Sequence, residues 1–220
     1  KKQSSLEAAL EYAKQGFPVF PAHFIPADHG KGQISTLCQG GRNAATTEPE
    51  QIRQWWTAFP DALIAISTGA ASGLLAVTTP QNTPLDTKNP SFSTFLGENC
   101  YIFQYPTTGE KPSCGNLDGG RFDGEGGFIV VPPSILAYKN AENEEVSGCY
   151  AVLQEGEIVG APGELLEKMR GVATVEKTER EIVTPKAGTP DIFRAVEKRQ
   201  EQEEEEQEED EGLPGLPLEI

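Results

Sequence analysis

The sequence predicts a domain that mixes a few short helices with a larger number of short strands. Three observations support this prediction. Ala62–Pro80 contains two uncharged apolar runs around a loop of small residues, a pattern typical of buried strands. Residues 4–16 and 47–59 each place apolar side chains at helical spacing. The region after about residue 173 is polar and shows no core pattern, so it is expected to add nothing to the fold.

The first predicted helix begins after Ser4, which forms a capping-box pattern with Glu7. Gly16 is suited to the position just after the last helical turn. Phe17–Pro21 then predicts a short apolar strand, and its prolines favour a sheet edge or a strand end over a central position. Residues 22–46 are polar and contain several glycines, so they predict a long loop.

The second predicted helix has Thr47 as its N-cap and Glu50 as the partner in a second capping box. It ends at Phe59, before a proline. Trp55 and Trp56 lie within it, and we interpret them as core anchors. Stacking on nucleic-acid bases is the alternative role for adjacent tryptophans.

The second half of the chain predicts further strands and a closing helix. The strands are Cys100–Tyr105, Phe128–Val131 and Cys149–Leu153, and the helix covers residues 162–170. Thr107–Gly120 is punctuated by glycine and proline, so it predicts a loop.

The net charge of −16 is concentrated at the C-terminal end. Glu201–Glu211 and Glu219 account for ten negative charges, which leaves −6 for residues 1–200. Because those residues hold no dense Lys/Arg patch, we expect weak sequence-independent affinity for DNA. The predicted organisation is a domain over 1–172, a linker or peripheral segment over 173–199, and an acidic, disordered tail over 200–220. Such a tail either docks on a protein partner or only improves solubility.

No run approaches the roughly 18 apolar residues that a membrane span needs, and the first residues show no apolar signal-peptide region. We therefore expect a cytoplasmic chain without membrane contact. Cys38, Cys100, Cys114 and Cys149 show no CxxC spacing. Buried free thiols are expected rather than a zinc site or disulfides.

The small-residue loop between the two central strands is a candidate for contact with phosphate. Its glycines permit positive φ and a close approach of the backbone to a ligand. The candidate nucleotide-binding or phosphate-binding residues are Lys31, Arg42, Ser67, Thr68 and Gly69. Isolated cations in a loop are equally explained by solvation. Weak binding of a nucleotide or of single-stranded DNA is therefore the most that this pattern predicts.

Several segments follow one another in a recognisable order. They include AALEYAKQGFPVFP from residue 8, ATTEPEQIRQWW from residue 45 and GEGGFIVVPPS from residue 124. Residues 60–66 and 68–74 lie between the last two. This ordered set resembles the N-terminal domain of bifunctional DNA primase-polymerases, of the archaeo-eukaryotic primase type, over roughly residues 6–171. The resemblance implies an α+β fold with an RRM-like sheet flanked by helices.

The chain departs from this family at the positions that carry the chemistry. The resemblance implies an Asp-x-Asp pair at the end of the second central strand, but Thr78, Thr79 and Pro80 stand there. It implies a histidine near Cys100 and a third carboxylate at the position of Arg121. Two-metal phosphoryl transfer needs several carboxylate oxygens. We therefore expect no catalytic residue and no metal site.

These departures predict a degenerate primase/polymerase-like domain that acts as a binding or structural module, linked to DNA replication or a mobile element. Two alternatives remain open. In the first, the chain is an active enzyme that binds Mg²⁺ or Mn²⁺ through relocated acids. The candidate acids are Asp86, Glu98, Asp118, Asp123 and Glu125. Solvation and turn formation also account for such acids. In the second, the chain is an acidic adaptor that binds a protein through its tail.

Overall fold

The computed structural model describes residues 3–26, 32–109, 111–139, 143–170 and 172. All of them belong to one structural unit, which covers residues 1–176. The predictions for Lys31, the 173–199 segment and the 200–220 tail lie outside the described residues. No helix within the described ranges is long and apolar enough to cross a membrane.

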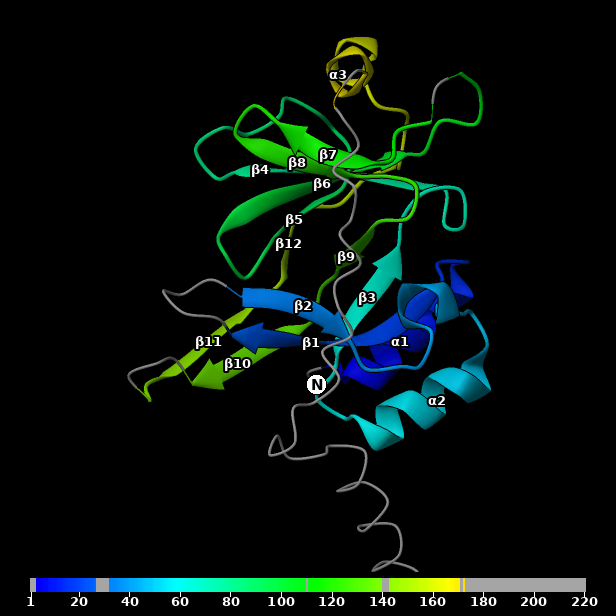
Figure 1. Ribbon diagram of the computed structural model, residues 1–220, viewed down its shortest axis with the longest axis vertical. Coiled ribbons are helices and arrows are strands. Elements are labelled where there is room, and N and C mark those ends of the chain that lie inside the picture. Colours follow the sequence, from blue (N-terminus) through cyan, green and yellow to red (C-terminus); the bar gives the residue numbers. More distant parts are fainter. Residues whose placement is uncertain (1–2, 27–31, 110, 140–142, 171, 173–220) are drawn as a thin grey trace, which may run out of the picture. The chain divides into compact units, whose positions relative to one another are not determined.

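The strands form two larger sheets and one separate hairpin, all with antiparallel pairing (Figure 1). The four-stranded sheet has the order β2-β1-β3-β9, with β1 Val19–Pro26, β2 Gly32–Thr36, β3 Leu63–Ser67 and β9 Phe128–Val130. The six-stranded sheet has the order β12-β5-β6-β4-β8-β7, with β4 Leu74–Pro80, β5 Ser91–Ser93, β6 Glu98–Gln104, β7 Cys114–Leu117, β8 Gly120–Asp123 and β12 Ala151–Gln154. The hairpin pairs β10 Ile135–Lys139 with β11 Glu145–Cys149.

The helices complete the predicted α+β architecture. They are α1 Ser5–Lys14, the 3₁₀ helix η2 Gly41–Ala44, α2 Pro49–Ala58 and α3 Gly163–Met169. The capping box of α1 is confirmed, because the Glu7 N–H donates to Ser4 Oγ and the Ser4 N–H donates to Glu7 Oε2. Gly16 has φ +91°, as expected just after the helix. Helices α1 and α2 contact each other and β1, whereas α3 contacts β7.

The start of α2 differs from the prediction. The N-cap is Glu48, not Thr47, and no side chain makes a capping bond there. Thr46 supplies the local hydrogen bond instead, since its Oγ1 accepts from the Glu48 N–H at 3.1 Å. Pro49 sets the start of the helix because its fixed φ suits the first helical position. Trp56 is 2% exposed, which confirms its role as a core anchor.

Two predicted loops contain hairpins instead. Residues 22–46 hold the end of β1 and all of β2, and Thr107–Gly120 holds β7 and the first residue of β8. Strand β1 lies between β2 and β3, so of the two predicted places for its prolines the sheet edge is wrong, whereas Pro21 does lie near one end of the strand. Pro21 is tolerated because β2 pairs with β1 only from Ala22 onward. The missing proline N–H therefore removes no bond between β1 and β2.

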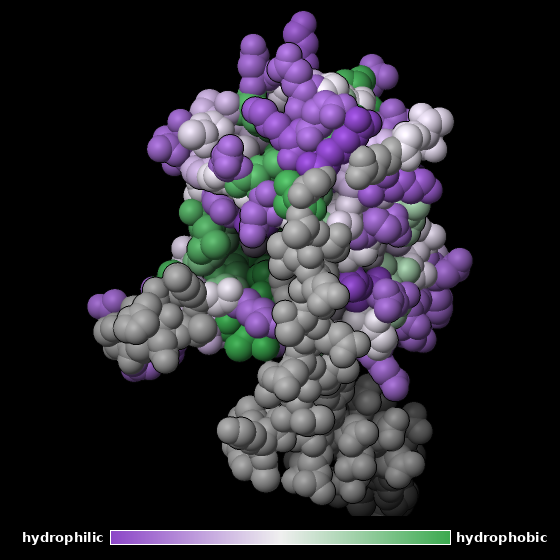
Figure 2. All heavy atoms as spheres, turned by 45° about the horizontal axis from the view of Figure 1, so that its top comes forward, coloured by the Kyte–Doolittle hydropathy of each residue, from purple (hydrophilic) through white to green (hydrophobic). Residues whose placement is uncertain are grey.

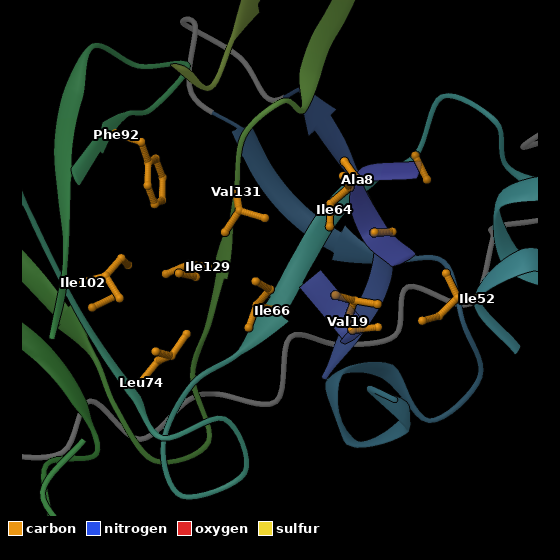
Figure 3. Packing of buried hydrophobic residues seen from close by; sticks show 14 of the residues in the cluster. Ala8, Val19, Ile52, Ile64, Ile66, Leu74, Phe92, Ile102, Ile129 and Val131 are labelled. Atoms are coloured by element: carbon orange, nitrogen blue, oxygen red, sulfur yellow. The ribbon is translucent and has the colours of Figure 1, made fainter. Parts of the chain in front are cut away.

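One hydrophobic cluster connects the two sheets with helices α1 and α2 (Figure 3). Its members include Val19, Ile64, Ile66 and Ile129 from the four-stranded sheet, Leu74, Ala76, Phe92, Cys100 and Ile102 from the six-stranded sheet, and Ala8, Ile52 and Trp56 from the helices. The opposite face of the six-stranded sheet packs Leu75, Val77 and Phe103 in a second cluster with Met169 of α3. The face that carries Cys100 is therefore turned toward the first cluster.

Candidate functional site

The two central strands form where the apolar runs predicted them, but they belong to different sheets. Strand β3 is buried along its whole length, and β4 is buried from Leu74 to Thr78. The small-residue loop between them is therefore the covalent link from one sheet to the other. This connection brings the end of β4 into the six-stranded sheet, between β6 and β8.

The loop is held against the turn that precedes β9. Thr68 Oγ1 donates to the Gly124 carbonyl at 2.8 Å, and the Ala70 N–H donates to Glu125 Oε2 at 2.9 Å. Gly69 has φ +93°, and a Cβ on it would lie 2.7 Å from the Glu125 Cα. Glycine is required there both by the backbone angle and by the close approach of the two segments.

The candidate phosphate-binding residues of the loop already donate hydrogen bonds within the chain. Ser67 Oγ donates to the Arg42 carbonyl at 3.1 Å. The Gly69 N–H donates to the Leu74 carbonyl at 2.8 Å, and the Thr68 hydroxyl is engaged as described above. Arg42 lies on η2, half-buried and next to Ser67. Phosphate binding by these residues stays a prediction, with the Arg42 guanidinium as its main described donor.

The positions that the family resemblance singled out meet in one row across three strands. Thr78 on β4 lies opposite Cys100 on β6 and opposite Arg121 on β8. Residues directly opposite one another in a sheet share a face, and every second residue along a strand shares it too. Pro80 therefore lies on the same face as Thr78, whereas Thr79 points to the other face. Thr78 and Pro80 thus correspond to the two aspartates of the Asp-x-Asp pattern, and Thr79 corresponds to the residue between them.

An arginine with two acidic partners occupies this row. Arg121 Nη1 lies 3.2 Å from Glu98 Oε2, and Arg121 Nε lies 3.5 Å from Asp123 Oδ2. Glu98 is on β6 and Arg121 on β8, so the guanidinium reaches across β4. Burial lowers the pKa of Arg121, but the carboxylates of Asp123 and Glu98 outweigh burial and raise it. The side chain stays a cation at every physiological pH.

Cys100 and Tyr150 are neutral side chains close enough to Arg121 for its charge to affect their pKa values. Burial raises the pKa of the Cys100 thiol to about 12, against the opposing effects of Thr78 and Arg121. The thiol is therefore protonated at neutral pH, and a protonated thiol is a poor nucleophile and a poor metal ligand. Burial likewise raises the pKa of Tyr150 to about 12, although Arg121 lowers it. The sequence placed Tyr150 only within the predicted strand Cys149–Leu153 and did not single it out as a site residue.

This row does not fit a two-metal centre. Mg²⁺ and Mn²⁺ are held by several carboxylate oxygens. The row offers instead a hydroxyl from Thr78, no ligand from Pro80 and a neutral thiol from Cys100. Glu98 and Asp123 are paired with Arg121. Across the described ranges, no three His, Cys, Asp or Glu side chains come together in an arrangement that could hold a metal ion.

The remaining candidate acids lie elsewhere. Asp86 is exposed in the connection between β4 and β5. Asp118 is exposed in the two-residue turn between β7 and β8, followed by Gly119 with φ +74°. Glu125 accepts from Ala70 in the loop contact. None of these three lies in the row across β6, β4 and β8.

All four cysteines are free thiols, as predicted, but they are not all buried. Cys100 and Cys114 are buried, Cys38 is half-buried and Cys149 is exposed. Cys149 is the last residue of β11, at the end of the two-stranded hairpin with β10. The prediction of burial was therefore wrong for Cys149 and only partly right for Cys38.

The arrangement defines an α+β domain in which a pinned loop joins two antiparallel sheets. Comparison with protein families matches residues 9–164 to the family described as bifunctional DNA primase/polymerase, N-terminal. The match covers most of the chain, so the chain belongs to this family, as the ordered segments predicted. No curated protein matches the chain.

Proposed function

We propose that this domain of the primase/polymerase family has lost the two-metal reaction and serves as a binding or structural module, linked to DNA replication or a mobile element. One observation carries the proposal. The row that the resemblance assigns to metal ligands holds a guanidinium paired with Glu98 and Asp123. A fixed positive charge repels Mg²⁺ and Mn²⁺ and occupies the oxygens that would bind them.

An active enzyme with relocated ligands is the alternative to this proposal. It would need Glu98 and Asp123 to exchange Arg121 for metal ions, with further oxygens from other segments. Asp123 is 17% exposed and Glu98 30% exposed in their side chains, so neither is freely hydrated. Releasing them from the arginine would leave partly buried charges unpaired, which opposes the exchange.

Primer synthesis and primer extension decide between the two functions. The assay uses the full chain with single-stranded template, deoxynucleotides or ribonucleotides, and either Mg²⁺ or Mn²⁺. The proposal predicts no metal-dependent product. Robust product that disappears in Asp123→Asn, but persists in the turn variant Asp118→Asn, would overturn the proposal and establish relocated ligands.

A remaining role in binding single-stranded DNA or a nucleotide fits the same proposal. Figure 2 shows a face on which a hydrophobic zone lies next to hydrophilic side chains. Three aromatic rings also contact one another between separate segments: Phe24 lies 4.9 Å from Tyr138 and 6.1 Å from Phe95, centroid to centroid. Aromatic side chains are platforms on which unpaired bases stack, although these three also pack against the core.

Fluorescence anisotropy with labelled single-stranded DNA measures this binding. We expect weak affinity that falls further as salt rises, since phosphate contacts release counterions. Arg42→Ala should weaken it, whereas Arg53→Ala on the exposed face of α2 should not. Equal affinity in both variants would exclude Arg42 from the contact.

A further inference from the structure

The turn between β7 and β8 contains an aspartate that is followed directly by a glycine. Asp118 and Gly119 are the two residues of this turn, since Leu117 pairs with Gly120 on either side of it. Both turn residues are exposed. The chain contains one other Asp-Gly step, Asp123-Gly124, which begins at the last residue of β8. The two steps share one local chemistry and differ in their surroundings.

We propose that the peptide bond between Asp118 and Gly119 is a site of spontaneous isomerisation to isoaspartate. The Gly119 nitrogen attacks Cγ of the protonated Asp118 carboxyl group. A bond between nitrogen and Cγ forms, and the hydroxyl leaves with the amide hydrogen as water, which gives a five-membered cyclic imide. Water then opens the ring. Opening at Cγ restores aspartate, whereas opening at the main-chain carbonyl carbon leaves Gly119 linked through Cγ.

This chemistry needs no oxidant, reductant or cofactor, because the water released on ring closure equals the water consumed on ring opening. It is also independent of the proposed function, since it uses only the backbone and the side chain of the turn. The product carries one extra methylene in its main chain and a new carboxylate beside it. A methyltransferase that recognises isoaspartyl carboxylates is the class of enzyme that would act on it.

The attacking nitrogen is unrestrained at Gly119 and restrained at Gly124. Among the residues that the structure describes, none accepts a hydrogen bond from the Gly119 N–H. The Gly124 N–H, by contrast, donates to the Ser113 carbonyl. A bonded N–H keeps its peptide plane in one orientation, because turning the plane leaves a buried donor without its partner. The peptide plane of Gly119 can therefore turn toward the Asp118 side chain at lower cost.

The two carboxyl groups differ in the same direction. Asp118 forms no ion pair or hydrogen bond with any described residue. Asp123 Oδ2 lies 3.5 Å from Arg121 Nε, and the Asp123 side chain is 17% exposed. Ring closure at Asp123 would require this carboxyl group to leave the guanidinium and take up a proton, which leaves a partly buried cation without one of its partners. Asp118 needs only to leave water.

Space at the glycine also favours the turn. Gly119 has φ +74°, and the heavy atom nearest to a Cβ built on it is Pro80 Cγ at 4.0 Å. The backbone can rearrange there, and no side chain shields the nitrogen. Gly124 is buried, and a Cβ on it would collide with the Pro112 carbonyl oxygen. Ring closure moves the backbone on both sides of the aspartate, so the packing around Gly124 opposes it.

Ageing the full chain in water enriched in heavy oxygen tests the proposal. Each opening of the imide takes one oxygen atom from the solvent, so every aspartate that has passed through the ring becomes labelled. Mass spectrometry of peptides locates the label, and electron-transfer fragmentation identifies the isoaspartyl product. We expect Asp118 to be labelled about tenfold or more faster than Asp123, because the latter must first lose an ion pair and a backbone hydrogen bond.

The same measurement in guanidinium chloride separates the effect of the fold from that of the local sequence. The unfolded chain keeps none of these contacts, so both aspartates should be labelled at similar rates. The proposal is wrong if Asp118 and Asp123 are labelled equally fast in the folded chain. It is also wrong if Asp118 stays unlabelled there while the unfolded chain is labelled, or if the unfolded chain shows the same preference for Asp118.

Two variants of the turn test the ring itself. Asp118→Glu would have to close a less favourable six-membered ring and should lose the label, whereas Asp86→Glu, at another exposed acid, should leave labelling at Asp118 unchanged. Asp118→Asn suits the turn, because Asn-Gly is typical of two-residue hairpins. It closes the same imide with loss of ammonia and should form isoaspartate faster than the unsubstituted chain. A folded Asp118→Asn variant that forms no isoaspartate would show that the turn cannot close the ring.

Discussion

The pinned loop and the ion-paired row lie at opposite ends of β4, and they differ in the kind of contact that holds them. The loop consists of small residues, and its donors reach a carbonyl and a carboxylate of the neighbouring turn. In the row, Arg121 pairs with Glu98 and Asp123, at the position where the family resemblance implies metal ligands. The contacts of the loop are thus mainly backbone contacts that support the fold, whereas those of the row are between charged side chains.

The largest effect is expected from Gly69→Ala in the loop. The substitution forces a side chain onto φ +93° and places its Cβ 2.7 Å from the Glu125 backbone. We predict a loss of about 2–4 kcal/mol in the free energy of unfolding in urea. Gly73→Ala is the control, because φ is +70° but nothing lies within 4 Å of its Cβ. It should cost only about 1 kcal/mol, and equal losses would mean that the contact with the turn contributes little.

Thr68→Val tests the hydrogen bond that pins the same loop. Valine has nearly the shape of threonine but removes one of two donors to the buried Gly124 carbonyl, which keeps the bond from the Gly127 N–H. We expect the free energy of unfolding to fall by about 1–1.5 kcal/mol. Thr83→Val removes the exposed bond to the Pro80 carbonyl and should change stability by less than about 0.5 kcal/mol. A neutral Thr68→Val would show that the loop does not depend on this bond.

In the row, Arg121→Gln should change stability less than either loop substitution. The ion pairs of Arg121 are partly screened by water, because its side chain is 46% exposed. We predict a loss of about 1 kcal/mol or less at low salt, and a smaller loss at 1 M salt. Chemical denaturation at both salt concentrations measures this. A loss as large as that of Gly69→Ala would make the row, and not the loop, the main support of the fold.

The smallest effect concerns the pH dependence of stability near Cys100. Its pKa rises from 9.0 to about 12 on folding, so the folded chain retains the proton longer than the unfolded chain. This contribution to stability is complete below pH 9 and is lost as pH rises from 9 toward 12. The free energy of unfolding of Cys100→Ala should decline less steeply with pH than that of the unsubstituted chain over that range.

Thiol labelling at pH 8 should modify exposed Cys149 rapidly and Cys100 only on unfolding.

The parts of the fold that the sequence predicted are those with strong local signals. The capping box at Ser4, the buried runs of β3 and β4 and the closing helix α3 all formed where expected. The hairpin of β7 and β8 was missed because its strands are short and polar. Asp118-Gly119 was its signal, since Asp-Gly is typical of two-residue hairpin turns.

The candidate site was predictable in its positions but not in its contacts. The family pattern placed Thr78, Cys100 and Arg121 together, and the strand register brings them into one row. The pairing of Arg121 with Glu98 joins residues 23 apart, and no local pattern predicts such a contact. Side chains alternate between the two faces of a strand, so Thr79 points away from the face that carries Thr78. This follows only when β4 is known to extend to Pro80.

Anomalous diffraction from crystals soaked with Mn²⁺ and a nucleotide tests the loss of metal chemistry most directly. We predict that the Arg121 guanidinium stays between Glu98 and Asp123, with no Mn²⁺ peak over the row of Thr78 and Cys100. An anomalous peak coordinated by Glu98 and Asp123, with Arg121 displaced, would contradict this prediction and restore metal chemistry to the site.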